Sequence, residues 1–277
     1  MKNFMKTSFS VFLLLCVAAS FAQTICGGRE TAMASDASFI KMHLNPKPYK
    51  HVTTAGGKSI VIPCPDGTKA NVYVIRTAKP SDNWLFVFQE WWGLNDYVKS
   101  EAERFFKALN VNVMALDMYD GKVASDAGTA AQYMKNFSQE RGNMIVKGGL
   151  AYVGAKARIA TVGWCFGGGQ SMQAALAGGE QTAGCVIYYG MPEEDVDRLM
   201  KLRGDVLFIW PNQDKWINQG VADRFKANMQ MAGKDLFVKE YDADHAFANP
   251  SNPKHNKPFA ENAFQAATTY LKERFAN

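Results

Sequence analysis

The chain has 277 residues, of which 47% are hydrophobic and 21% charged, and its formal net charge is +5. This length suits one large α/β domain or two small ones. The mild charge, without a dense run of lysine and arginine among aromatic residues, leaves no electrostatic footprint for nucleic acid, so we expect no nucleic-acid partner.

The N-terminus has the pattern of a secretory signal peptide. Lys2 and Lys6 precede an apolar run at residues 11–19, and Ser20 and Ala22 are the small residues at −3 and −1 of a cut after Ala22. The run is too short to cross a bilayer, which needs about 20 apolar residues, and no later stretch is long enough either. We therefore expect a periplasmic or secreted protein without membrane contact after cleavage. Its charge falls from +5 to +3 because the two lysines leave.

The rest of the chain alternates between predicted strands and helices. Residues 23–56 lack clear periodicity and predict an extended connector. Two strands joined by a turn at Asp66-Gly67 then predict an antiparallel edge hairpin. From Trp84 onward the alternation predicts a mostly parallel sheet with helices on both faces. Strands are expected at residues 58–63, 70–77, 83–90, 111–118, 158–164, 183–190, 205–211 and 236–242, and helices at 95–109, 123–155 (broken near Gly142 and Gly148), 166–177, 193–202, 219–231 and 258–275.

The stretch TVGWCFGGG, residues 161–169, places Cys165 among four glycines. A Walker A loop would need a following Gly-Lys-Ser/Thr, and a dinucleotide fingerprint would have glycine where Cys165 stands. The strand before it and the small-residue helix after it favour a nucleophile elbow, G-x-C-x-G, in which Gly163 and Gly167 leave room at a sharp turn. The alternative is a buried structural cysteine beside a helix cap.

A cysteine nucleophile needs a base, and the base needs an orienting carboxylate. His245 follows the last strand, where the base belongs, whereas His255 lies in a polar loop. Asp214 directly follows a strand, at the edge where open α/β sheets bind ligands. Asp242 and Asp244 are too close to His245 in sequence to face its far ring nitrogen, and we expect them to be solvated.

An oxyanion hole is expected beside the elbow. One N–H comes from Phe166, the residue after the nucleophile, and the other from Trp91, in the loop after the strand at residues 83–90. For Glu90, the residues alone leave open a carboxylate of the site or a surface charge at a strand end. Such a site needs no cofactor and no metal, and the cysteines and histidines show no zinc spacing.

Together these motifs resemble the dienelactone hydrolase family of α/β-hydrolases. The resemblance runs in family order over FVFQEWWGLND, ALDMYDG, ATVGWCFGGG, VIYYG, NQDKW and YDADHAFANP. It implies an α/β-hydrolase fold with Cys165 as nucleophile, His245 as base and Asp214 as acid. It also implies that Glu90 is the family glutamate that lies beside the thiol and governs its protonation. We accordingly divide the chain into a signal peptide (1–22), an N-terminal extension (23–56) outside the resemblance and a hydrolase domain (57–277).

The resemblance fails at the arginines that bind the substrate carboxylate in the family. Asn249 stands where the resemblance implies one of them, four residues after His245. Arg141 and Lys135 are the candidates to replace the other. This departure puts an anionic dienelactone in doubt.

We therefore expect an exported, monomeric hydrolase that cleaves a small-molecule ester or lactone through a cysteinyl acyl-enzyme. One alternative is a non-catalytic ligand-binding protein on the same scaffold. Another is a thiol redox sensor in which Cys185, on the next strand, resolves Cys165. Because export implies an oxidising compartment, we also expect a disulfide between Cys26 and Cys64, both outside the likely core.

Overall fold

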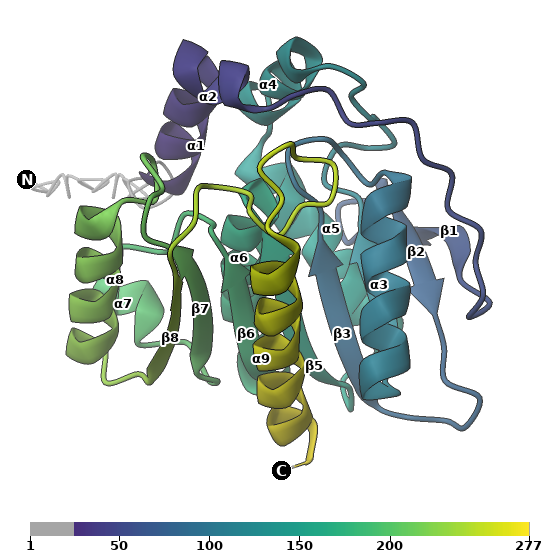
Figure 1. Cartoon of the computed structure of the whole chain (residues 1–277). Coiled ribbons are helices and arrows are strands. Elements are labelled where there is room, and N and C mark those ends of the chain that lie inside the picture. The colour runs from purple at the N-terminus through teal and green to yellow at the C-terminus, as the bar shows by residue number, and fades with distance from the viewer. Residues whose placement is uncertain (1–24, 277) are drawn as a thin grey trace, which may run out of the picture.

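The computed structural model describes residues 25–276, and the predicted signal peptide lies outside them. A central sheet is flanked by helices (Figure 1). Within the described range, no helix combines the length and the apolar character needed to cross a membrane. The strands are β1 (Lys58–Pro63), β2 (Lys69–Ile75), β3 (Asn83–Phe88), β4 (Asn112–Leu116), β5 (Arg158–Trp164), β6 (Thr182–Tyr188), β7 (Val206–Pro211) and β8 (Leu236–Tyr241). The helices are α1 (Ile25–Ser35), α2 (Ala37–Met42), α3 (Asp96–Leu109), α4 (Ala127–Lys135), α5 (Gln139–Val153), α6 (Phe166–Gly178), the 3₁₀ turn η1 (Gly179–Gln181), α7 (Val196–Leu199), α8 (Gln219–Met231) and α9 (Lys257–Ala276).

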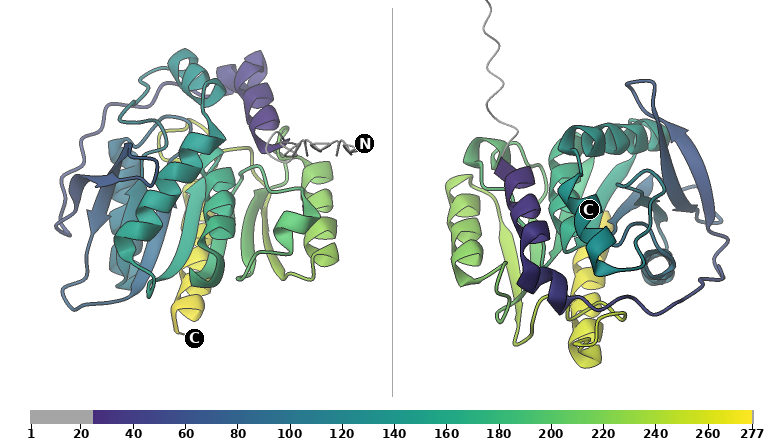
Figure 2. Two further views of the ribbon diagram at one scale, coloured as in Figure 1. Left: turned by 180° about the vertical axis from the view of Figure 1, so that it is seen from behind. Right: turned by 90° about the horizontal axis from the view of Figure 1, so that it is seen from above.

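The strands form one sheet in the order β1-β2-β4-β3-β5-β6-β7-β8. β1 pairs antiparallel with β2, and β2 pairs antiparallel with β4. All other neighbours are parallel. α3 and α9 cover one face, and α5 and α6 cover the other (Figure 1, Figure 2). The predicted mostly parallel sheet, with helices on both faces and an antiparallel edge hairpin, is confirmed.

The inner parallel strands are buried because helices lie on both faces of the sheet. Every residue of β4 and β7 is buried, as is every residue of β3 after Asn83. Continuous apolar runs in the sequence therefore report burial on two faces, which parallel sheets require. Because the strands are parallel, their carboxyl ends meet at one edge of the sheet, and the site lies at this edge.

The helical region after β4 differs from the prediction. The break expected near Gly142 and Gly148 lies instead between α4 and α5, and α5 runs unbroken through both glycines. Close packing explains them: an added Cβ would lie 2.6 Å from the ring of Phe137 at Gly142, and 2.9 Å from the carbonyl oxygen of Pro63 at Gly148. α7 is also shorter than predicted, with four residues.

The N-terminal segment, which we define as residues 25–56, is not simply the extended connector expected. It begins with α1 and α2, and only the residues from His43 onward lack regular structure before β1. Asp36 caps α2, and Phe39 within this helix is fully buried. In the view from above, the two helices lie across the carboxyl edge of the sheet (Figure 2). The segment therefore covers the part of the molecule where the site was predicted.

The predicted disulfide between Cys26 and Cys64 is wrong, because Cys64 is a free and buried thiol. It follows β1 and contacts the Arg141 guanidinium, with 3.7 Å between Sγ and Nη1. Cys26 belongs to α1, which packs on α4. Figure 1 shows β1 at one edge of the sheet and α1 well away from it. A disulfide needs Cα atoms within about 7 Å, so these two elements are too far apart for one.

Candidate active site

Cys165 lies at the sharp turn between β5 and α6, with φ of 54°. Its flanking glycines are required by contacts with backbone atoms. A Cβ added to Gly163 would lie 2.0 Å from the carbonyl oxygen of Gly167, and one added to Gly167 would lie 2.4 Å from that of Phe88. Real Cβ atoms do not approach backbone this closely. The strained cysteine and the crowded glycines together form the predicted elbow.

A chain of two hydrogen bonds connects Cys165, His245 and Asp214. His245 Nε2 lies 3.2 Å from Cys165 Sγ, and His245 Nδ1 lies 2.6 Å from Asp214 Oδ2. Because a carboxylate only accepts, Nδ1 donates its proton to Asp214, and in the neutral form of the ring Nε2 can accept a proton from the thiol. All three side chains are buried, with 3% of Cys165 exposed. We call this chain the thiol–imidazole–carboxylate relay.

The sheet brings the three relay residues to one edge. Cys165 follows β5, Asp214 follows β7 and His245 follows β8. Asp214 is held by the N–H groups of Trp216 and Ile217, which donate to its Oδ1 at 2.9 and 3.0 Å. The other oxygen is thereby left to orient the imidazole, as the relay requires.

The alternative acids and base lie outside the relay. Asp242 accepts a hydrogen bond from Gln213, and Asp244 pairs with Lys254. His255 is half-buried in the loop before α9. The structure therefore places the carboxylate and the histidine as the sequence predicted, and neither flanking aspartate competes for His245.

Burial and neighbouring charges set the proton affinities in the relay. Burial raises the pKa of the Cys165 thiol, the His245 charge lowers it, and the Glu90 carboxylate raises it. Burial lowers the pKa of His245, but Asp214 and Cys165 together raise it well above its usual value. The resting thiol therefore keeps its proton more firmly than an exposed cysteine does.

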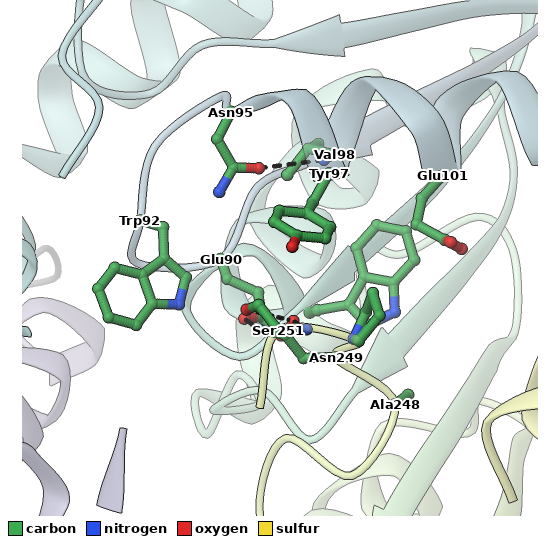
Figure 3. A pocket seen from close by; sticks show the side chains of 11 residues that line it. Glu90, Trp92, Asn95, Tyr97, Val98, Glu101, Ala248, Asn249 and Ser251 are labelled. Atoms are coloured by element: carbon green, nitrogen blue, oxygen red, sulfur yellow. Dashed lines mark hydrogen bonds between the residues drawn. The ribbon is translucent and has the colours of Figure 1, made fainter. Parts of the chain in front are cut away.

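Glu90 is a buried carboxylate at the end of β3, not a surface charge. Tyr189 Oη donates to its Oε1 at 3.2 Å, and Asn249 Nδ2 donates to its Oε2. Burial raises the pKa of Glu90 to about 7. Glu90, Asn249 and Trp92 line a cavity of about 40 Å³ between α3 and the loop after His245 (Figure 3). Glu90 thus acts on the relay through its charge.

The two predicted oxyanion donors follow neighbouring strands. Phe166 is the first residue of α6, and its N–H hydrogen-bonds the Cys165 thiolate and lowers the pKa of the thiol. Trp91 follows β3, which pairs with β5. In the part of the chain that the structure describes, the Trp91 N–H has no hydrogen-bond acceptor. The Trp91 amide is thus unpaired at this edge of the sheet, and the Phe166 amide lies at the sulfur of Cys165.

Comparison with known proteins places this geometry in a family. The model of the dienelactone hydrolase family matches residues 70–275. The chain belongs to the dienelactone hydrolase family. As a member, it is a hydrolase that acts on ester bonds, and its substrate is a small molecule.

Relatives and solved structures agree with the dienelactone hydrolase family match. A relative from Saccharolobus solfataricus, provisionally named carboxymethylenebutenolidase, is 31% identical over 116 residues, or 42% of this chain and 44% of the relative. The match therefore spans under half of that relative. Protein usf of Aquifex pyrophilus is 25% identical over 221 residues, or 75% of this chain and 95% of the relative. A dienelactone hydrolase-like promiscuous phosphotriesterase from metagenomic libraries has a TM-score of 0.69 at 18% identity, covering 78% of this chain and 98% of that structure. This similarity confirms the α/β-hydrolase fold.

In this member of the dienelactone hydrolase family, no cation among residues 25–276 replaces the two family arginines at the relay. Asn249 donates to Glu90 instead of offering a charge to a substrate. Arg141 pairs with Asp120 and donates to the carbonyl oxygen of Lys69, and it lines a separate cavity of about 230 Å³. Lys135 is exposed at the end of α4. Neither of the two candidates, Arg141 and Lys135, supplies a cation beside Cys165.

Cys185 is too far from Cys165 to resolve it. The register pairs Thr161 with Cys185, and Trp164 with Tyr188. Cys185 therefore lies level with a residue four positions before Cys165, about 13 Å away along the strand. A disulfide needs Cα atoms within about 7 Å. This distance contradicts the alternative of a redox sensor in which Cys185 resolves Cys165.

Sequence reasoning missed the side chains that the N-terminal segment adds to the site. The ring centroids of Phe39 and His43 lie 5.6 and 5.8 Å from that of His245. Glu30 of α1 is buried against Gly169 of α6, just beyond the elbow. The i,i+4 spacing of Phe39 and His43 next to a capping aspartate is the one signal that would have indicated a helix here.

Proposed function

We propose that this hydrolase cleaves a neutral ester or lactone through a thioester on Cys165. The relay supports the proposal, because a thiol within 3.2 Å of a buried imidazole has its base in place. The carboxylate of Asp214 fixes the tautomer of His245 and stabilises the imidazolium that forms. Family membership supports an ester as the bond that is cleaved, and the relay supports Cys165 as the nucleophile.

Each step of the proposed reaction uses a group of this chain. His245 Nε2 takes the thiol proton as Cys165 Sγ bonds to the carbonyl carbon. The carbonyl oxygen becomes negative, and the N–H groups of Phe166 and Trp91 donate to it. The C–O bond then breaks, and the imidazolium gives its proton to the leaving oxygen. Water next attacks the thioester, His245 takes and returns a proton, and the C–S bond breaks to release the acid.

The charges around the relay support a neutral substrate. Glu90 is a buried carboxylate near the thiol, and a second negative charge in this low-dielectric region would be repelled. Asn249 is neutral and already donates to Glu90. An uncharged ester or lactone avoids the repulsion by Glu90 and needs no cation at position 249.

Loss of the thiol tests the proposal most directly. Wild type, Cys165→Ala and Cys185→Ala are compared on p-nitrophenyl esters and on lactones. We expect Cys165→Ala to lower kcat by about 10⁴-fold or more with an unchanged melting temperature. Cys185→Ala, a matched loss of a buried thiol away from the relay, keeps the activity. Mass spectrometry of the quenched wild-type enzyme should show the acyl group on Cys165. Near-normal turnover by Cys165→Ala would refute the nucleophile.

We also propose that the protein is exported, on the strength of the charged, apolar and small-residue pattern that ends at Ala22. Mass spectrometry of protein recovered outside the cytoplasm should give an N-terminus at Gln23. Protein that starts at Met1 in every fraction would contradict export.

A further inference from the structure

The N-terminal segment supplies one wall of the relay, although it lies outside the family match at residues 70–275. Phe39 and His43 of this segment are both buried and lie beside the ring of His245. Phe39 belongs to α2 and His43 directly follows it, and α1 and α2 cross the carboxyl edge of the sheet (Figure 2). The base of the relay is therefore packed against side chains that lie outside the family match.

The hydrogen bonds of His43 fix which ring nitrogen carries the proton. Nδ1 lies 2.7 Å from the carbonyl oxygen of Phe39, and a carbonyl only accepts, so Nδ1 is the donor. Burial, and then the charge of His245, lower the pKa of His43 to about 3, so the ring is neutral. Nε2 is consequently an acceptor. It is buried and has no hydrogen-bond partner anywhere in residues 25–276.

Two unpaired donors accompany this unpaired acceptor. The rings of Trp91 and Trp92 lie 4.4 and 6.4 Å from the ring of His43, measured between centroids. Both indole N–H groups are buried and, like His43 Nε2, have no partner among the described residues. Buried polar groups are nearly always hydrogen-bonded in native proteins, so three together point to a bound group that completes them.

A hydroxyl group completes such a set, since it can donate to His43 Nε2 and accept from an indole N–H. A carboxylate has no proton to donate, and an alkyl chain pairs with none of the three. We propose that His43 determines specificity in this enzyme, and that Nε2 accepts a hydrogen bond from a hydroxyl close to the scissile bond of a neutral ester or lactone. The inference rests on the proposed ester hydrolysis and adds the substrate class: a hydroxylated ester.

Matched pairs of esters test the hydroxyl. Phenyl hydroxyacetate is compared with phenyl methoxyacetate, and 2-hydroxyethyl acetate with 2-methoxyethyl acetate. The methoxy compound keeps the acceptor, loses the donor and adds one methyl group, whose steric effect remains in the His43 variants described below. In wild type, we expect at least one pair to show about a tenfold higher kcat/KM for the hydroxyl form, the effect of one buried hydrogen bond. Ratios below about threefold for both pairs overturn the proposal without any variant.

Variants at His43 assign the preference to its Nε2. His43→Phe keeps the ring and removes the acceptor, so the ratio should fall below about threefold while hydrolysis of the methoxy ester continues. His43→Gln places an amide oxygen near the position of Nε2 and should restore the preference. The matched control is His51→Phe in the same segment, because His51 pairs with Glu103 away from the relay. It should keep the wild-type ratio.

The outcomes separate this inference from the proposed function. If His43→Phe is active and keeps the hydroxyl preference, His43 is not its source and the inference fails while ester hydrolysis stands. If His43→Phe does not fold, His43→Gln and the wild-type ratios decide. If wild type hydrolyses no ester or lactone at all, the proposed function fails and this inference fails with it.

Discussion

The relay and the N-terminal segment meet at the same edge of the sheet but are held by different means. Around Cys165, the backbone of β3, β5 and α6 packs so closely that Gly163 and Gly167 have no room for a Cβ. The N-terminal segment is anchored by a few buried side chains, chiefly Glu30, Phe39 and His43. Close backbone packing therefore holds the nucleophile in one position. Side-chain packing leaves the covering segment free to differ, which suits a role in selecting substrates.

Glycine replacements should show this difference most strongly. In Gly167→Ala, the new Cβ would meet the carbonyl oxygens of Phe88 and Gln89 at 2.4 and 2.3 Å, and neither can move without shifting β3. We expect a loss of about 3 kcal/mol or more in the free energy of unfolding, together with loss of activity. Urea denaturation and ester hydrolysis measure the two effects.

The matched control is Gly28→Ala in α1, where an added Cβ meets no atom within 4 Å. Alanine favours the helix, so this variant should be about 0.5–1 kcal/mol more stable and fully active. If both replacements had the same effect, the contrast between backbone packing and side-chain packing would be unfounded.

The relay could be predicted from the sequence, whereas the N-terminal segment could not. Buried parallel strands leave continuous apolar runs, and the elbow leaves its glycines, so the sheet and Cys165 could be located. Asp214 and His245 could be placed because each follows a strand of that sheet. The residues alone did not decide Glu90, since its burial depends on Tyr189 and Asn249, which are far away in the chain.

The N-terminal helices could not be predicted in the same way. α1 has the sequence ICGGRETAMAS, with two glycines and no amphipathic pattern. Its buried Glu30 packs against Gly169, a contact that no local pattern encodes. The break expected near Gly142 failed for a related reason, because glycine there serves close packing within an unbroken helix.

Two buried glutamates, Glu30 in the N-terminal segment and Glu90 beside the relay, titrate differently from exposed glutamates. Burial raises the pKa of Glu30 from 4.5 to about 8, against a side-chain hydrogen bond from Gln170 that lowers it. The folded protein therefore keeps this proton up to about pH 8, whereas the unfolded chain loses it near pH 4.5. Between these values stability should fall as pH rises, by at most about 1.4 kcal/mol per pH unit.

Glu30→Gln should flatten that pH dependence, because the amide does not titrate. Thermal unfolding from pH 5 to pH 8 measures it for both proteins. Asp36→Asn is the matched control in the same segment: its carboxylate has a pKa of about 2, lowered first by the Ser38 hydroxyl, so it is charged throughout the range. It should shift all melting temperatures alike. Parallel curves for wild type and Glu30→Gln would mean that Glu30 does not anchor α1 in protonated form.

Glu90, on the relay side, should affect reactivity as well as stability. Its carboxylate raises the pKa of Cys165, and its own pKa of about 7 means that it becomes charged as pH rises through neutrality. Glu90→Gln removes this charge, so the pKa of the thiol should fall and alkylation by iodoacetamide should quicken, by up to about tenfold. The two rate profiles should converge below pH 7, where Glu90 is protonated, and separate above it.

The matched control for Glu90 is Glu101→Gln, because Glu101 lines the same cavity but pairs with Arg104. Its alkylation profile should match that of wild type. Peroxide inactivation gives a second readout, since the thiolate is the form that oxidises, and it should quicken in Glu90→Gln alone. Superimposable profiles for wild type and Glu90→Gln would show that burial and His245 set the thiol by themselves. The pKa of Cys165 would then be set without any contribution from the carboxylate of Glu90.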